Sequence, residues 1–287
     1  MFISQIFNFL ERYQNIEKEK FLEILSISNT QAFQPFKFEK DFLLTLILIK
    51  FGEKYPDLVF KGGTCLNKIY FPYFRLSEDL DFVLDVDLGR SARKTLLKEY
   101  ENNFIDDLAI LGMTLRDERT KFDEYKLAMF TFEYNSIIDD SIQTIKIDIA
   151  LKQRLLLSPV PGRIQSIFIE PVYEESLFGD HTISCINLSE SIAEKMRAAL
   201  TRGTPAIRDF FDIWYVKQYS AFDFDDIVFR ELVYVKLQEV EYLYTLDEYY
   251  ELLKKQVTTD LMPVLSDTYD FDFQEIYDFI LSFKKPR

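Results

Sequence analysis

The sequence predicts an α/β (α+β) half over residues 1–180, followed by a helical half over residues 181–287. Segments with the short apolar or alternating pattern of β-strands lie in the first half, between helical segments. After residue 180 the pattern is helical to the C-terminus. With 48% hydrophobic residues, eight glycines and nine prolines in 287 residues, the chain has enough apolar material for a folded core.

The first elements are expected to be helix, strand, turn and helix. The opening MFISQIFNFLERYQ has the spacing of an amphipathic helix, and EKDFLLTLILIKFGEKYP has the length of a buried helix that ends at Gly52 and Pro56. The apolar run DLVF, followed at once by glycines, predicts a strand that leads into a turn. The segment TCLNKIYFPYF then predicts a helix that Pro72 interrupts.

Strands and helices continue to alternate up to the middle of the chain. LDFVLDV alternates apolar and acidic residues, as expected of a strand with one solvated face. The helical segment SARKTLLKEYENNFIDDLAILG separates it from two further strands, KLAMFTFEY and TIKIDIAL. In the second half, LSESIAEKMRAALTRG and AIRDFFDIWYVKQYS are predicted helices, and Phe211, Trp214 and Tyr215 are expected in the core.

Composition narrows the function classes. The formal net charge of −14 argues against broad coating of nucleic acid, although residues 142–218 are neutral and could carry a local positive surface. The apolar stretch FLLTLILI is far shorter than the ~20 residues that cross a bilayer, so no membrane partner is expected. Cys65 and Cys185 show no pairing pattern, which favours the cytoplasm, and with His181 as the single histidine they argue against zinc.

Three aspartates predict a metal site. Asp79 and Asp81 are two residues apart in a predicted strand, so both carboxylates point to one face. Mg²⁺ prefers oxygen ligands and commonly takes one or two carboxylates plus phosphate oxygens. Asp148, between apolar neighbours in TIKIDIAL, is the candidate third carboxylate, and the alternative is an exposed strand residue. The pattern predicts a site for Mg²⁺ or Mn²⁺ with an NTP as substrate.

A glycine turn precedes these aspartates. Gly62 and Gly63 allow the backbone to turn sharply and to approach a phosphate closely. Thr64 follows at the start of a helix, where its hydroxyl can donate and the helix dipole favours an anion. Alone, Gly-Gly-Thr is an ordinary turn and Asp-x-Asp an edge-strand pattern, but in this order they predict nucleotide binding.

The stretches KGGTCLNK and RLSEDLDF resemble the AbiEii/AbiGii nucleotidyltransferase toxin family, which belongs to the DNA-polymerase-β-like superfamily. The resemblance implies a nucleotidyltransferase fold, with a mixed central sheet flanked by helices. The residues that occur in the family's order are Gly62, Gly63, Thr64, Leu66, Lys68, Arg75, Ser77, Asp79 and Asp81. By this resemblance Lys68, Arg75 and Ser77 join the glycine turn as nucleotide-binding residues.

A second family signature matches AEKMRAALTRGTPAIRDFFDIWYV in the helical half. It implies that Lys195 reaches the triphosphate, that Arg202 and Asp212 contribute to nucleotide binding, and that Asp209 joins Asp79, Asp81 and Lys195 in catalysis. The plainer alternatives are a solvated stripe for Lys195 and Arg202, and an intrahelical ion pair between Arg208 and Asp212. The resemblance covers residues 58–216.

The resemblance implies a toxin of a type IV toxin–antitoxin pair, as in phage defence by abortive infection. Such an enzyme would transfer NMP to an RNA acceptor, the 3′ end of tRNA, and so block translation, with a cognate antitoxin as a further partner. Related toxins carry a self-modification site at the hydroxyl matching Ser77. Two alternatives stay open: transfer to a cationic small molecule such as an aminoglycoside or to a protein hydroxyl, and a catalytically silent NTP-binding protein.

Overall fold

The computed structural model describes residues 18–30, 32–119, 122–151, 154–172, 174–240, 246–265 and 269–283. The amphipathic helix predicted for the opening segment lies outside these residues. The chain forms two compact units, one made of Met1–Arg154 and Pro159–Cys185, the other of Leu155–Ser158 and Ile186–Arg287. The short segment Leu155–Ser158 therefore belongs to the second unit although it interrupts the first.

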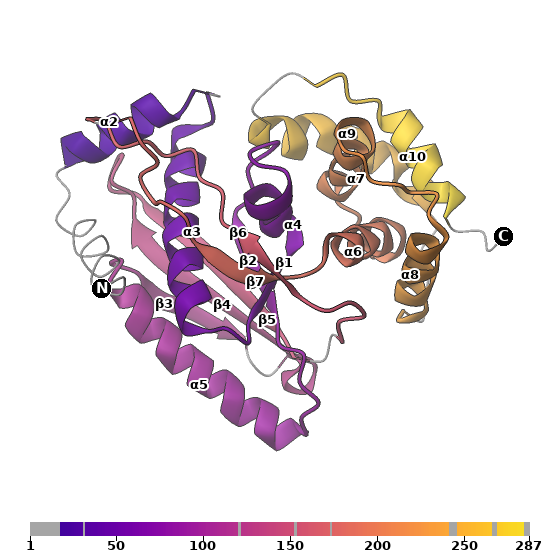
Figure 1. Cartoon of the computed structure of the whole chain (residues 1–287), viewed down its shortest axis with the longest axis horizontal. Helices are drawn as coiled ribbons and strands as arrows, with labels where there is room; N and C mark the ends of the chain where they lie inside the picture. Colours follow the sequence, from indigo (N-terminus) through magenta and orange to yellow (C-terminus); the bar gives the residue numbers. More distant parts are fainter. Residues whose placement is uncertain are drawn as a thin grey trace. The chain divides into compact units, whose positions relative to one another are not determined.

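The first unit is built on a seven-stranded sheet with the order β3-β4-β5-β2-β1-β7-β6 (Figure 1). The β5–β2 and β1–β7 pairs are parallel and the other four are antiparallel, so the predicted mixed sheet in an α/β unit is confirmed. The strands are β1 (Val59–Lys61), β2 (Asp79–Val83), β3 (Thr114–Arg119), β4 (Leu127–Asn135), β5 (Ile142–Ala150), β6 (Val160–Arg163) and β7 (Thr182–Cys185).

Two long helices, α3 (Pro35–Lys54) and α5 (Arg90–Ala109), pack on one face of this sheet (Figure 1). Phe51 of α3 contacts Phe82 of β2 and stacks on Phe104 of α5, with ring centroids 5.6 and 4.5 Å apart. Phe104 in turn meets Phe130 of β4 edge to face. Because strand side chains alternate, the residues next to these phenylalanines point to the opposite face.

Shorter elements complete the first unit. They are α2 (Lys18–Ser28), α4 (Gly62–Cys65), the π-helix η1 (Leu66–Tyr70) and the 3₁₀ turn η2 (Phe122–Tyr125). The predicted helix stop is wrong at Gly52 and right at Pro56, because α3 continues through Gly52 to Lys54 and ends just before Pro56. A Cβ at Gly52 would lie 2.6 Å from the carbonyl oxygen of Thr182, so this glycine permits close packing of α3 on β7.

The sequence patterns missed β3, β6 and β7. β6 contains Pro161 and Gly162, which are poor strand formers, and it lies at the edge of the sheet, where proline is tolerated. β7 brings Cys185 next to β1, and its buried thiol is hydrogen-bonded to the buried thiol of Cys65. The two cysteines, which show no pairing pattern in the sequence, are therefore neighbours as free thiols.

The second unit is helical. Its elements are α6 (Leu188–Thr201), α7 (Ile207–Tyr219), α8 (Ile227–Gln238), η3 (Leu246–Tyr249), α9 (Tyr250–Gln256), η4 (Val257–Leu261), η5 (Met262–Val264) and α10 (Phe273–Ser282). Phe211 and Trp214 of α7 are buried, stack on each other and contact Phe271. This aromatic cluster confirms the core prediction for Phe211 and Trp214, whereas Tyr215, also expected in the core, is only half-buried. Among the residues in the ranges given above, no helix is long and apolar enough to cross a membrane.

Candidate active site

Three carboxylates share one face of the sheet. Asp79 and Asp81 are two residues apart on β2, and Leu80 and Phe82 point to the opposite, buried face. The parallel pairing of β2 with β5 aligns Asp81 with Asp148. On β5, Ile147 and Ile149 are fully buried on the other face, so the alternation that the sequence predicted for this strand is present. The fold therefore places Asp148 beside Asp81, about one strand spacing (~4.8 Å) away.

The carboxylate of Asp148 lies in an unfavourable environment. Burial, followed by the negative charges of Asp81 and Asp79, raises the pKa of Asp148 to about 7, although Lys146 opposes this shift. Its Oδ1 atom is buried and has no hydrogen-bond partner among the described residues. An unsatisfied buried oxygen next to like charges is stabilised when a cation binds, because the cation supplies both the missing contact and the opposite charge.

These observations fit a hard divalent cation. The donors on this face are carboxylate oxygens, which Mg²⁺ and Mn²⁺ prefer over nitrogen or sulfur. In the part of the chain that the structure describes, no three His, Cys, Asp or Glu side chains are already gathered around a common point. Asp79 is exposed, so its carboxylate has room to rotate toward an ion and substrate phosphates, whereas Asp81 is half-buried and packed against Gly62.

Gly62 brings the backbone against this acidic face. It is the residue that follows β1, and its φ of +79° lies in the left-handed region that glycine adopts readily. A Cβ at this position would lie 2.2 Å from Oδ2 of Asp81. Any other residue at this position would therefore displace the Asp81 carboxylate. The glycine turn and the candidate metal site are thus in direct van der Waals contact.

Gly63 faces a cation and a hydroxyl. A Cβ there would lie 2.6 Å from Nη2 of Arg75 and 3.3 Å from Oγ of Ser77. Arg75 is buried, and its Nη1 atom donates to the carbonyl oxygen of Leu76 at 3.1 Å. The structure thus brings Gly62, Gly63, Arg75 and Ser77 together beside Asp81. One positively charged side chain therefore lies next to the glycine turn.

The side chains of Thr64 and Lys68 make hydrogen bonds within the protein. The hydroxyl of Thr64 donates to the backbone carbonyl of Asp79 and so ties the start of α4 to the start of β2. The fully buried ammonium of Lys68 donates to Asp41, Thr45 and Tyr73 at 2.6, 2.9 and 2.8 Å. These three bonds use all of its donors, so we assign Lys68 a structural role and leave it out of the nucleotide-binding set that the sequence predicted.

The four predicted residues of the second unit meet one another. Nζ of Lys195 on α6 lies 2.8 Å from a carboxylate oxygen of both Asp209 and Asp212 on α7. Arg202 pairs with the other oxygen of Asp209 at 2.9 Å. Asp212 is fully buried and Lys195 is 13% exposed, so the solvated stripe considered for Lys195 is wrong. The network joins two helices, and the predicted contacts of its members with nucleotide stay predictions.

Two lysines outside the predicted set of site residues also lie on the acidic face. Lys61 ends β1 and is the cross-strand partner of Asp81, and Lys146 is aligned with Asp79 on β5. The sequence carried a signal for both, since Lys61 directly precedes Gly62 and Lys146 is two residues before Asp148. Only the strand order, however, brings β1 and β5 to either side of β2.

Comparison with known proteins identifies the family to which the chain is similar. The family model described as nucleotidyl transferase AbiEii toxin, type IV TA system, matches residues 47–278. The crystal structure of JHP933 from Helicobacter pylori is 16% identical with a TM-score of 0.48, covering 88% of this chain and 91% of that chain. A candidate nucleotidyltransferase from H. pylori is 18% identical with a TM-score of 0.47, covering 85% and 91%. No curated protein matches the chain.

Proposed function

The chain belongs to the AbiEii nucleotidyl transferase toxin family, and we propose that it transfers NMP from an NTP to an RNA acceptor, the 3′ end of a tRNA. The observation that carries this proposal is the alignment of Asp81 with Asp148 on neighbouring strands, with Asp79 on the same face and Gly62 against Asp81. Carboxylates crowded on one sheet face beside a glycine turn suit a metal-bound triphosphate.

In this proposal Asp79, Asp81 and Asp148 hold Mg²⁺ or Mn²⁺. When bound, such an ion neutralises charge on the phosphate and orients the groups that react. Asp81 is fixed in position by Gly62 and by its cross-strand partners, whereas Asp79 at the exposed start of β2 can adjust to the substrate. Catalysis is then mainly positioning and electrostatic stabilisation, and it needs no histidine.

The turn and its arginine would bind the triphosphate. Backbone N–H groups at Gly62 and Gly63 can approach phosphate oxygens because no side chain stands in the way. The buried guanidinium of Arg75 lies directly against Gly63 and adds positive charge at this turn. Lys195 and Arg202 keep their predicted contribution to phosphate binding, with Asp209 and Asp212 orienting the ammonium of Lys195.

The family supports one part of the regulation, since a toxin of a type IV system implies a cognate antitoxin. The tRNA acceptor is our proposal, in which modification of the 3′ end would stop translation. One observation favours a second candidate: the net charge of −14 suits a cationic acceptor, such as an aminoglycoside, better than a polyanion. Purified protein, Mg²⁺ and each labelled NTP in turn should label total tRNA. Label that appears on an aminoglycoside and not on tRNA would instead establish the second candidate.

The metal site can be tested by removing one charge at a time. We expect Asp79→Asn and Asp81→Asn each to reduce transfer at least about 10²-fold, because a lost ligand weakens metal binding without touching the apolar core. Asp148→Asn should also reduce transfer, and it should raise the melting temperature without metal because it removes repulsion from Asp81. Rates and thermal shifts with and without Mg²⁺ measure both effects.

Asp87→Asn is the matched control, since Asp87 is exposed and lies just beyond the end of β2. It should keep the wild-type rate and the wild-type stabilisation by Mg²⁺. If Asp79→Asn and Asp81→Asn both stay within a few-fold of the wild-type rate, these carboxylates do not hold the catalytic metal and the proposed function loses its site.

A further inference from the structure

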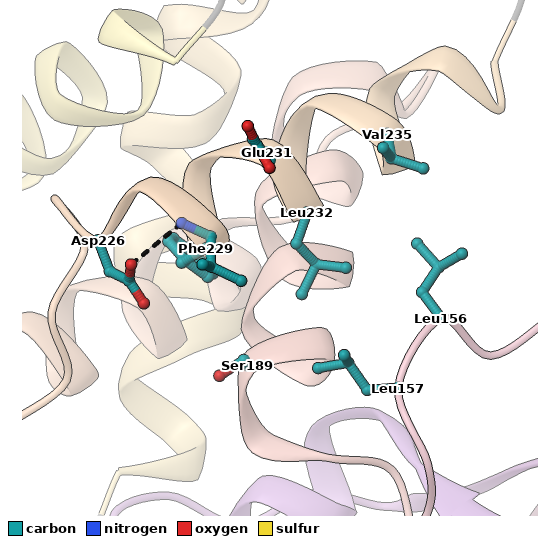
Figure 2. A pocket seen from close by; sticks show the side chains of 9 residues that line it. Leu156, Leu157, Ser189, Asp226, Phe229, Glu231, Leu232 and Val235 are labelled. Carbon is teal, nitrogen blue, oxygen red and sulfur yellow. Dashed lines mark hydrogen bonds between the residues drawn. The ribbon is translucent and has the colours of Figure 1, made fainter.

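A groove runs along α8 in the second unit. Between α8 and residues Leu156 and Leu157 lies a pocket of about 300 Å³ (Figure 2). Leu232 and Val235 of α8 face Leu156 and Leu157 across its opening (Figure 2). These four facing residues of the α8 groove are apolar, and no residue of the proposed metal site lines it.

The outer surface of α8 extends the apolar character of the groove. Ile227, Val228, Tyr234 and Val235 are 72%, 65%, 52% and 42% exposed. They lie at the spacing i, i+1, i+7 and i+8, with Glu231 between them, and so form one stripe along a single face of the helix. Single exposed apolar residues are ordinary, but several that flank one carboxylate on a single helix face, beside a pocket with apolar residues, are typical of a surface that another chain covers.

The groove is held open by a buried ion pair. Nζ of Lys236 on α8 lies 2.6 Å from the carboxylate of Glu190 on α6, and both side chains are fully buried. The same carboxylate accepts the backbone N–H groups of Leu156 and Leu157 at 2.8–3.0 Å. Breaking such a pair leaves an uncompensated buried charge. The two walls are thus fixed relative to each other before any partner binds, which lowers the entropic cost of binding.

The charges around the groove are negative. Asp226 and Glu231 line the pocket, and its described lining residues include no lysine or arginine. One oxygen of Asp226 caps α8 by accepting the N–H of Val228 at 3.0 Å. Glu231 is exposed and makes no ion pair with another residue in the described ranges. A partner that has no basic group and fills the apolar part of the groove would leave these two carboxylates partly desolvated and unpaired.

A second copy of this chain fits the groove poorly. The stripe is symmetric about Glu231, because Ile227 and Val235 lie four residues before and after it. If two α8 helices packed antiparallel about a two-fold axis, the two Glu231 side chains would face each other at its centre. Like charges in an apolar contact are unfavourable, so charge complementarity favours a different, basic partner.

We propose that the α8 groove binds a basic amphipathic helical segment of another protein. Its apolar side chains fill the pocket between α8 and Leu157, and a Lys or Arg beside them pairs with Glu231 and Asp226. This is recognition of a helix in a groove, with anchors at helical spacing. The inference is independent of nucleotidyl transfer, since it uses no residue of the proposed metal site.

The probe is a labelled helical peptide of about four turns, with leucines on one face and lysines on the other, compared with a counterpart that has glutamates in place of the lysines. Fluorescence anisotropy with the full chain should show the Lys peptide binding at least about tenfold tighter. Glu231→Lys should reverse this preference, and Val228→Ser combined with Val235→Ser should weaken the Lys peptide at least about tenfold. Hydrogen exchange should show protection at Leu157 and along α8.

Two matched variants separate the groove from the general acidity of the chain. Glu251→Lys makes the same charge change at an exposed position of α9, and Met262→Ser removes an apolar side chain that is 59% exposed outside the groove. Both should bind the Lys peptide as the wild type does. Equal binding of the two peptides, no binding of either, or an equal effect of Glu251→Lys would overturn the proposal. Self-association that Val235→Ser abolishes would overturn it too, with a second copy as the occupant.

Discussion

Gly62 shows how a single residue couples backbone conformation to chemistry. Its φ of +79° is strained for any residue with a side chain, and a Cβ would collide with Oδ2 of Asp81. Gly63 differs, because its φ is not in the left-handed region, although a Cβ there would lie 2.6 Å from Nη2 of the buried Arg75, which would have to shift. Two adjacent glycines therefore carry different constraints.

We expect Gly62→Ala to lose about 1–3 kcal/mol of stability through backbone strain. Transfer should fall about 10²-fold or more, because the displaced Asp81 no longer holds its position. Gly63→Ala is the comparison and should lose less stability, because it adds no backbone strain and has only to shift the Arg75 side chain. Urea unfolding and initial rates measure both variants, and a Gly62→Ala protein with wild-type activity would show that Asp81 does not depend on this turn.

Glu39 is a buried acid of α3 and is not part of the proposed metal site. Burial raises its pKa above the usual 4.5, and this outweighs the hydrogen bonds that it accepts from the hydroxyl of Ser136 and the N–H of Ile137. Asp139 adds to the increase and Lys18 opposes it. Between the unfolded pKa and the raised folded pKa, the folded state binds the proton more tightly. Stability should therefore fall as the pH rises through this window.

The measurement is the free energy of unfolding at several pH values from 4 to 8, a range of about four units around the normal Glu pKa. The wild type should lose stability with rising pH relative to Glu39→Gln, which cannot ionise. If both proteins show the same pH dependence, Glu39 does not contribute the expected linkage.

At the scale of elements, α6 and α7 are joined by charges and not only by apolar contacts. Lys195 lies between Asp209 and Asp212, whose side chains are 4% and 0% exposed. Removing the lysine leaves two carboxylates with little solvent, although Arg202 still pairs with Asp209. A loss of activity at Lys195 is thus ambiguous until stability has been measured.

We expect Lys195→Met to lose about 3–5 kcal/mol of unfolding free energy, the usual cost of leaving a buried charge uncompensated. Adding Asp212→Asn should recover part of this loss, since the remaining buried group is then neutral. Urea unfolding of the two single variants and the double variant gives the coupling energy. A Lys195→Met protein that unfolds like the wild type would make any loss of activity a direct effect on substrate.

At the scale of the whole molecule, the chain passes from one unit to the other more than once. Residues Leu155–Ser158 belong to the second unit, while Pro159–Cys185 return to the sheet of the first. Leu156 and Leu157 satisfy the buried carboxylate of Glu190, which also pairs with Lys236. A fragment that begins at residue 181, the boundary expected from the sequence, therefore lacks part of its own core.

We expect the fragment 181–287 to unfold at lower urea concentration than the second unit does in the intact chain, because Glu190 loses its backbone donors. A synthetic peptide of residues 154–160 added in excess should restore part of the difference. A peptide with Leu156 and Leu157 changed to Ser is the control. Circular dichroism follows both, and a fragment as stable as the intact unit would show that this segment is dispensable.

Much of the fold was readable from local pattern. The alternation in TIKIDIAL predicted the buried isoleucine face of β5 and the opposite face with the half-buried Asp148. The helical spacing in AIRDFFDIWYV predicted that Phe211 and Trp214 lie in the core. Among the strands that were not predicted, β6 and β7 have only four residues each, and Pro161 and Gly162 of β6 are poor strand formers. Such strands form because neighbouring strands supply hydrogen bonds, which local propensity does not register.

The sequence by itself determined the glycine turn, the acidic pair on one strand and the change from an α/β half to a helical half. Each of these features depends on residues that are close together in the chain. Only the tertiary structure shows that Asp148 lies beside Asp81, that Cys65 contacts Cys185, and that Lys68 donates a hydrogen bond to Asp41. These are contacts between segments far apart in sequence. Strand order and helix packing bring such segments together, and no local pattern encodes either of them.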